Sequence, residues 1–191
     1  MEMLNSTSVK ILFAFMVVLQ CWIPASMILN NEAVIKNGFS YKFKTAPIDP
    51  SDPFRGKYVD LAFEENSLSV TDPENWINGE SVYLRLTQDE EGYAKLLSVS
   101  RVRPDHDIYF TAKINRIKTK DDPELVFNYP FERFYMEESK AYEAEQLHRS
   151  SRIDSTKSTY AVVKILGGES ALIDVQINGE SLKELVKERQ E

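Results

Sequence analysis

The sequence predicts a mainly β protein, in which one N-terminal transmembrane helix precedes an antiparallel β domain. Three observations support this prediction. Residues 11–29 form an uncharged apolar run. Beyond them, apolar and polar side chains alternate in short runs, a pattern typical of half-buried antiparallel strands. Gly, Pro, Asn and Asp residues separate these runs, as turn residues do. Only residues 137–149 break the alternation with a helical composition.

Composition narrows the classes of function. The 191 residues suit one domain or two small ones, and 30 acidic against 23 basic residues give a net charge of −7. That balance argues against a nucleic-acid-binding surface. One cysteine excludes an internal disulfide and a cysteine-based zinc cluster, and two histidines leave little material for a metal site. We therefore expect no metal, no cofactor and no nucleic-acid partner.

After a short flank at residues 1–10, the apolar run ILFAFMVVLQCWIPASMIL occupies residues 11–29. As a helix it would span roughly 28 Å, close to the hydrocarbon thickness of a bilayer. A retained single-pass anchor is the favoured interpretation, which makes the lipid bilayer the first expected partner. A cleaved signal peptide is the main alternative, although the run is long for one and Pro24 suits cleavage after Ser26 poorly. A buried helix of a soluble domain is the third interpretation.

The charges around this run leave its orientation open. Lys10 precedes it, whereas Lys36, Lys42 and Lys44 follow it. The positive-inside count slightly favours a cytoplasmic domain, but the rule loses force for long translocated domains. Residues 30–191 hold all but one of the basic and all but one of the acidic residues, so they form a polar, soluble domain.

The alternating runs predict the strands of that domain. The cleanest lies at 107–117, where Ile108, Phe110 and Ala112 share one face. Residues 89–92 and 167–168 lie between successive runs, as hairpin loops do. The expected strands are 40–45, 57–63, 81–87, 93–102, 107–117, 159–166 and 170–177.

Two segments favour helix. Residues 137–149 combine good helix formers with a possible N-cap at Ser139 and a basic end at His148 and Arg149. Residues 181–191 suit a short charged helix or a frayed tail. The polar stretch 150–158 suits a loop.

A weak internal repeat suggests a duplicated β unit. The Pro-Phe pair at 53–54 and Tyr58 recur 77 residues later, as the pair at 130–131 and Tyr135. Repeats at 38–117 and 118–178 would then form a sandwich or two small barrel-like lobes, with a chance match as the alternative. The pentapeptide INGES, at 77–81 and 177–181, follows a different offset, which indicates shared turn chemistry.

The densest motif is TAPIDPSDPFRGKYVDLAF at residues 45–63. It resembles the GDYXXLXY family, a set of bacterial membrane-anchored proteins named for their motif. Lys57 stands where the motif has Asp, and Phe63 where it has the final Tyr. FERFY at 131–135, followed by two glutamates, resembles the second block of the family.

The resemblance implies a membrane-anchored protein with its domain outside the cytoplasm and no established activity. It also implies a polytopic membrane protein as a partner. Lys57 argues against any role that needs a carboxylate at that position.

The residues themselves favour a structural role for most of the motif. Proline fixes the chain entry, Gly56 permits a tight turn, and Tyr58 and Leu61 anchor a strand. The sharper hypothesis is a site for an anion or a peptide carboxylate, because arginine binds such groups in bidentate fashion. Its binding residues would be Arg55, Tyr58, Arg133 and Tyr135. The structural residues would be Asp52, Pro53, Phe54, Gly56 and Leu61.

Two functions follow as hypotheses. The first is a non-enzymatic, membrane-tethered interaction module that engages another membrane or envelope protein through a sheet edge or an aromatic groove. The second is an envelope ligand-binding domain or small hydrolase that uses Arg55, Arg133 and nearby carboxylates. No catalytic residue is assigned, since no GxSxG, P-loop or HExxH motif occurs. Weaker candidates are His106 and Ser40, the latter as a nucleophile paired with a lysine on a later strand.

Overall fold

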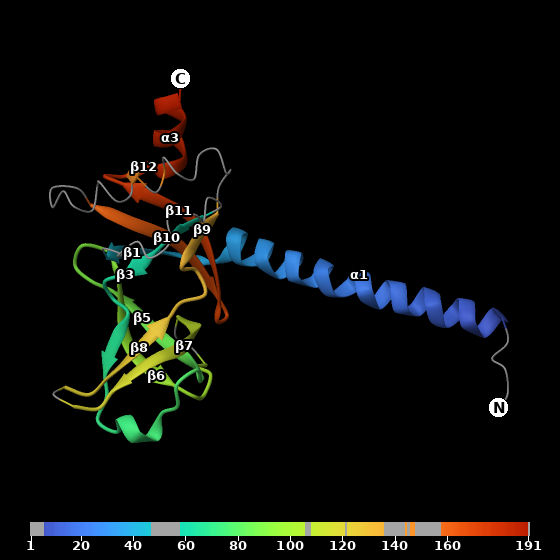
Figure 1. The fold of residues 1–191 in the computed structure, drawn as a ribbon, viewed down its shortest axis with the longest axis horizontal. Helices are drawn as coiled ribbons and strands as arrows, with labels where there is room; N and C mark the ends of the chain where they lie inside the picture. The colour runs from blue at the N-terminus through green and yellow to red at the C-terminus, as the bar shows by residue number, and fades with distance from the viewer. Residues whose placement is uncertain are drawn as a thin grey trace.

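The computed structural model describes residues 6–46, 58–105, 108–120, 122–135, 144, 146–147 and 158–190. A long helix, α1, projects from a β-rich body made of two sheets (Figure 1). The fold class expected from the sequence, an N-terminal apolar helix followed by mainly antiparallel β structure, is confirmed.

Helix α1 (Ser6–Asn37) has 32 residues, so it is about 48 Å long. It extends well past the apolar run at 11–29, because residues 30–37 continue the same helix. Near its C-terminal end Val34 is buried, and this end contacts strands β10 and β11. The helix therefore leaves the β domain from a packed joint.

The first sheet has the order β12-β11-β10-β1-β3 and is antiparallel throughout. The short helix α3 (Leu182–Gln190) follows it, and Leu182 and Val186 of that helix are fully buried. The strands are β1 (Phe39–Ala46), β3 (Ala62–Phe63), β10 (Thr159–Leu166), β11 (Glu169–Ile177) and β12 (Glu180–Ser181).

The second sheet, of order β4-β8-β7-β5-β6, is also antiparallel. A 3-10 turn at Pro73–Asn75 lies between β4 and β5. A separate two-stranded ribbon consists of β2 (Tyr58–Asp60) and β9 (Arg133–Tyr135). The sheet strands are β4 (Ser67–Ser69), β5 (Ser81–Gln88), β6 (Ala94–Ser100), β7 (Tyr109–Lys118) and β8 (Glu124–Asn128).

An aromatic cluster joins the two sheets into one core. Phe43 of β1 and Phe63 of β3 meet Phe110 of β7 and two rings of the β8–β9 connection, Tyr129 and Phe131. Ring centroids within this cluster lie 5.0–6.1 Å apart. The buried Tyr129 hydroxyl donates a hydrogen bond to the backbone carbonyl of Glu65, so the only polar group of the cluster is satisfied.

Most expected strands occur, and one is divided. The run at 57–63 becomes β2 and β3, which pair with β9 and β1 respectively. At the break, the amide of Leu61 donates to the backbone carbonyl of Glu132 at 2.7 Å. The short strands β4, β8, β9 and β12 were not expected.

Turn chemistry explains the hairpins. The Asp89 carboxylate accepts the amides of Glu91 and Tyr93 at 3.0 and 2.8 Å, which closes the β5–β6 turn. In the two INGES segments, Gly79 and Gly179 both adopt left-handed backbone, with φ of 83° and 88°. This shared conformation fits the interpretation of that pentapeptide as turn chemistry.

The two expected helices and the expected duplication have separate outcomes. Of the helix expected at 137–149, residues 144, 146 and 147 are described and helical, and the rest lie outside the described residues. The short charged helix expected at the C-terminus is α3. The duplication into 38–117 and 118–178 stays a prediction; the sheets do not follow that division, because β1 pairs with β10 and β8 pairs with β7.

Candidate functional site

The β2–β9 ribbon brings together residues from the two motif blocks. Its antiparallel register sets Tyr58 opposite Tyr135 and Asp60 opposite Arg133. Val59 and Phe134, between them, point inward and are almost fully buried. Because side chains alternate along a strand, the remaining four share the other side. We call this set, Tyr58, Asp60, Arg133 and Tyr135, the outer ribbon face.

Contacts between its members hold the outer ribbon face in one arrangement. The rings of Tyr58 and Tyr135 lie 5.6 Å apart between centroids. The Arg133 guanidinium carbon lies 4.9 Å above the Tyr58 ring, a cation–π geometry, and its Nε lies 3.8 Å from an Asp60 carboxylate oxygen. A hydrogen-bonding interaction with Tyr135 is the main cause that raises the pKa of Arg133 above its usual value. Arg133 therefore stays cationic at every accessible pH.

Exposure makes this face available to a binding partner. Tyr135 is 63% exposed, unusual for a large aromatic side chain. Arg133 and Asp60 expose about half of their side chains, at 53% and 56%. The face is thus an open surface with a fixed cation flanked by two aromatic rings.

The other residues singled out from the sequence divide into two groups. Leu61 is buried beneath the ribbon at 3% exposure. Asp52, Pro53, Phe54, Arg55 and Gly56 lie outside the described residues, so the anion-site hypothesis meets the structure only at Tyr58, Arg133 and Tyr135.

Sequence reasoning missed two carboxylates beside these residues. Asp60 and Glu132 line a cavity of about 300 Å³ next to the ribbon, together with the amide side chains of Asn66, Asn115 and Asn128. Burial raises the pKa of Glu132, while the hydrogen bond that its carboxylate accepts from the Tyr129 amide, at 2.7 Å, opposes that rise. The alternation within the motif could have revealed Asp60, since it shares a face with Tyr58.

The hydrolase hypothesis finds little support in the described ranges. Ser40 of β1 lies directly opposite Lys164 of β10, but their side chains make no hydrogen bond to each other, as a nucleophile and its base would. His106 and the four glutamates within 137–145 lie outside the described residues. Within the described ranges, no three His, Cys, Asp or Glu side chains gather closely enough to hold a metal.

Comparison with known proteins identifies a family. The family model described as "GDYXXLXY protein" matches residues 20–175, which is most of the chain. That range includes the C-terminal half of α1, both motif blocks and all but the end of β11. Comparisons with curated proteins and with solved structures gave no match.

Proposed function

The chain belongs to the GDYXXLXY protein family, and from that premise we propose that it is a single-pass, membrane-anchored interaction module. In this proposal, α1 holds the β domain at the bilayer outside the cytoplasm. The outer ribbon face then engages a second membrane or envelope protein, with no chemical reaction at the site.

Helix α1 supports the anchoring part of the proposal. Its segment Val9–Asn37 is long and apolar enough to cross a membrane, and none of its most apolar stretch is buried against the domain. An apolar surface of this size in water is unfavourable, whereas a bilayer of roughly 30 Å hydrocarbon thickness would cover it. The 19 residues from Ile11 to Leu29 carry no charge that would oppose insertion.

The outer ribbon face supports the binding part, and its exposed tyrosine–arginine cluster carries the proposal. Tyrosine and arginine dominate the binding energy of protein interfaces. Because Tyr58, Arg133 and Tyr135 already fix one another, a partner would meet side chains that lose little further freedom on binding. An exposed cluster suits a protein surface better than a small carboxylate ligand, which is normally enclosed in a concave pocket.

Site-specific photocrosslinking tests the binding part in native membranes. A photoreactive phenylalanine analogue replaces Tyr135 in the full chain. We expect a discrete adduct heavier than the monomer, containing a second membrane protein. The matched control places the same analogue at the exposed Lys120, beyond the end of β7, where we expect no such adduct.

A second arm links the adduct to the cluster. With the analogue at Asp60, we expect Tyr135→Ala to abolish the adduct and Lys120→Ala to leave it unchanged. Equal adducts from positions 135 and 120, or an adduct at 60 that survives Tyr135→Ala, would show that this face does not engage a partner.

The single cysteine allows a clean test of orientation. In a Cys21→Ser background, we expect Lys120→Cys to react with a membrane-impermeant maleimide on intact cells. Thr7→Cys, at the other end of α1, should react only after permeabilisation. The reverse pattern would place the domain in the cytoplasm.

A further inference from the structure

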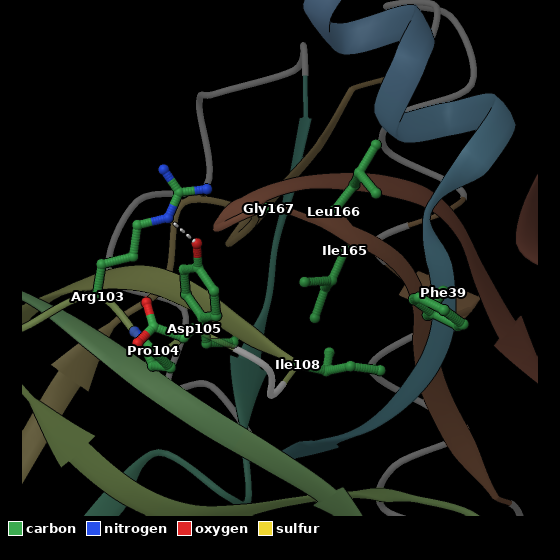
Figure 2. A pocket seen from close by; sticks show the side chains of 9 residues that line it. Phe39, Arg103, Pro104, Asp105, Ile108, Ile165, Leu166 and Gly167 are labelled. Atoms are coloured by element: carbon green, nitrogen blue, oxygen red, sulfur yellow. Dashed lines mark hydrogen bonds between the residues drawn. The ribbon is translucent and has the colours of Figure 1, made fainter.

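A cavity of about 680 Å³ opens beside the C-terminal end of α1 (Figure 2). It lies where the end of the helix, the β10–β11 hairpin and the β6–β7 connection meet. Phe39, Ile108, Ile165 and Leu166 give it an apolar wall, and Arg103, Asp105 and Tyr109 give it a polar side. It is more than twice as large as the cavity next to the ribbon.

The polar side carries two opposite charges that do not neutralise each other. Arg103 lines the cavity and donates a hydrogen bond from Nε to the Tyr109 hydroxyl, so its two terminal nitrogens are not used in that bond. No ion pair within 4.0 Å joins Arg103 to Asp105 or to another carboxylate among the described residues. A cation and an anion that line one cavity while remaining apart suit a ligand that carries both charges.

Arg103 is held there by a packed support. Its partner Tyr109 is only 5% exposed. The Tyr109 ring fits against Gly168, where an added Cβ would lie 2.7 Å from the ring. The hairpin is tied to the second sheet, since the Thr111 amide donates to the Gly168 carbonyl at 2.9 Å. The hydroxyl that binds the exposed Arg103 side chain is therefore fixed by the fold.

The cavity lies close to where the lipid headgroups would be. The end of α1 from Asn30 to Lys36 rises about 10 Å, slightly more than the headgroup layer of roughly 5–8 Å on one side of a bilayer. Phe39 lies three residues past Lys36, just outside that layer, and is 61% exposed. The β10–β11 hairpin lies on the side of the domain from which α1 departs (Figure 1).

We propose that this cavity binds a phospholipid with an ammonium headgroup, drawn from the bilayer that holds α1. Arg103 binds the phosphate, and Asp105 binds the ammonium group. Phe39, Ile108 and Leu166 contact the glycerol. This inference rests on the anchoring of α1 proposed above and adds a lipid to the protein partner.

Photolabelling of the full chain in lipid nanodiscs tests this assignment. The probe is phosphatidylethanolamine with a diazirine near the glycerol, and mass spectrometry locates the adducts. We expect adducts at the cavity wall as well as along α1. Arg103→Gln should reduce the cavity adducts roughly tenfold, as the loss of a charge-assisted hydrogen bond does. The matched control Arg116→Gln, an exposed arginine of β7 outside the cavity, should leave them unchanged.

Two further variants separate the charges from the fold. Arg103→Lys keeps the positive charge but lacks the Nε that donates to Tyr109. We expect this variant to retain most of the cavity adducts, because the phosphate still meets a cation. Asp105→Asn should abolish the preference for phosphatidylethanolamine over phosphatidylglycerol. Thermal melts of each variant show whether the domain still folds.

The possible failures are distinguishable. Cavity adducts that survive Arg103→Gln, or equal labelling by the two lipids in the unmodified protein, would overturn the lipid site. Competition of the probe by millimolar inorganic phosphate would assign the cavity to a free anion and also overturn it. Adducts along α1 without any at the cavity would refute the lipid site alone, whereas no adducts along α1 would refute the anchoring.

Discussion

Phe43 is the side chain through which the two sheets contact each other most directly. It is 1% exposed, and its ring meets those of Phe63, Phe110, Tyr129 and Phe131. Edge-on and tilted ring pairs of this kind add to the free energy of burial. One residue of β1 thus contacts both halves of the core.

Replacement of Phe43 by alanine should therefore destabilise the whole domain. We expect Phe43→Ala to lower the free energy of unfolding by about 3–5 kcal/mol, because it leaves a cavity among rings that cannot all move inward. Urea titration of the purified full chain in detergent measures the change. Leu97→Ala, on a side chain that is 53% exposed, should change the same quantity by less than about 0.5 kcal/mol. Equal effects at both positions would contradict the central place of Phe43.

Glu132 should give the stability of the domain a recognisable pH dependence. Burial raises the pKa of this carboxyl above its usual 4.5, so folding favours the protonated form. The folded state therefore loses stability as the pH rises through the raised pKa, where the carboxylate forms. Glu132→Gln cannot ionise and still offers an oxygen to the Tyr129 amide. We expect this variant to be more stable than the unmodified protein at pH 7 and to lose that advantage near pH 4.

Denaturation curves at both pH values measure this difference. Glu74→Gln is the control, because Glu74 is exposed and does not line this cavity, and we expect it to show no such difference. An advantage of Glu132→Gln that is constant with pH would contradict the argument.

At the scale of elements, the strands that the sequence predicts well are those with a long, unbroken alternation. Strand β7 buries Phe110, Ala112 and Ile114 and exposes the residues between them, so local pattern and burial agree. Strand β8 buries Leu125 and Phe127 in the same way, but the six residues between Pro123 and Pro130 give too short a pattern to recognise. The division of β2 from β3 is invisible locally, because it depends on the distant carbonyl of Glu132.

The two tyrosines and the arginine of the outer ribbon face were predicted from the sequence, whereas Asp60 and the geometry of the face were not. The 77-residue offset already matched Tyr58 with Tyr135. Their antiparallel pairing in the ribbon is a contact between distant segments, whose register depends on how the rest of the domain packs. Asp60 entered the site for the same reason, since it becomes a neighbour of Arg133 only in that register.

The β10–β11 hairpin offers a test of how tightly one element fits another. Gly168 has φ of +95° and no room for a Cβ beside the rigid Tyr109 ring, whereas Gly92 in the β5–β6 hairpin has φ of +82° and open space around it. Both Gly→Ala changes cost about 1 kcal/mol for left-handed backbone. We expect Gly168→Ala to cost roughly 1–3 kcal/mol more, because overpacking forces neighbouring groups to move. Equal unfolding midpoints for the two variants would contradict this fit.

At the scale of the whole molecule, the organisation is a long unpartnered helix joined to a packed β domain. The segment that the domain leaves uncovered is the apolar stretch within Val9–Asn37. The domain itself buries its central aromatic cluster, with Phe43 and Phe110 almost fully enclosed. Helix α1 thus suits the hydrocarbon of a bilayer, whereas the β domain suits water.

A single charge within α1 should reveal which solvent covers it. Val18 is 66% exposed and lies near the middle of the apolar run. Arginine at the centre of a spanning helix costs about 2.5–3.5 kcal/mol, so we expect Val18→Arg to shift much of the full chain into the alkali-extractable fraction. Val18→Leu should remain fully integrated. An unmodified chain that alkali already extracts would refute the anchoring directly.

The joint at Gly38 has a mechanical consequence. A Cβ at this position would lie 2.5 Å from the Val34 carbonyl oxygen and 3.1 Å from the Ile165 amide nitrogen. The backbones of helix and sheet are therefore too close here to admit a side chain. Because β1 starts at the next residue, no linker separates α1 from the first sheet. We therefore expect a tilt or rotation of α1 to move the strands of the first sheet with it. A neighbouring protein that reorients this helix would thereby re-aim Tyr135 and Arg133, without touching the domain that carries them.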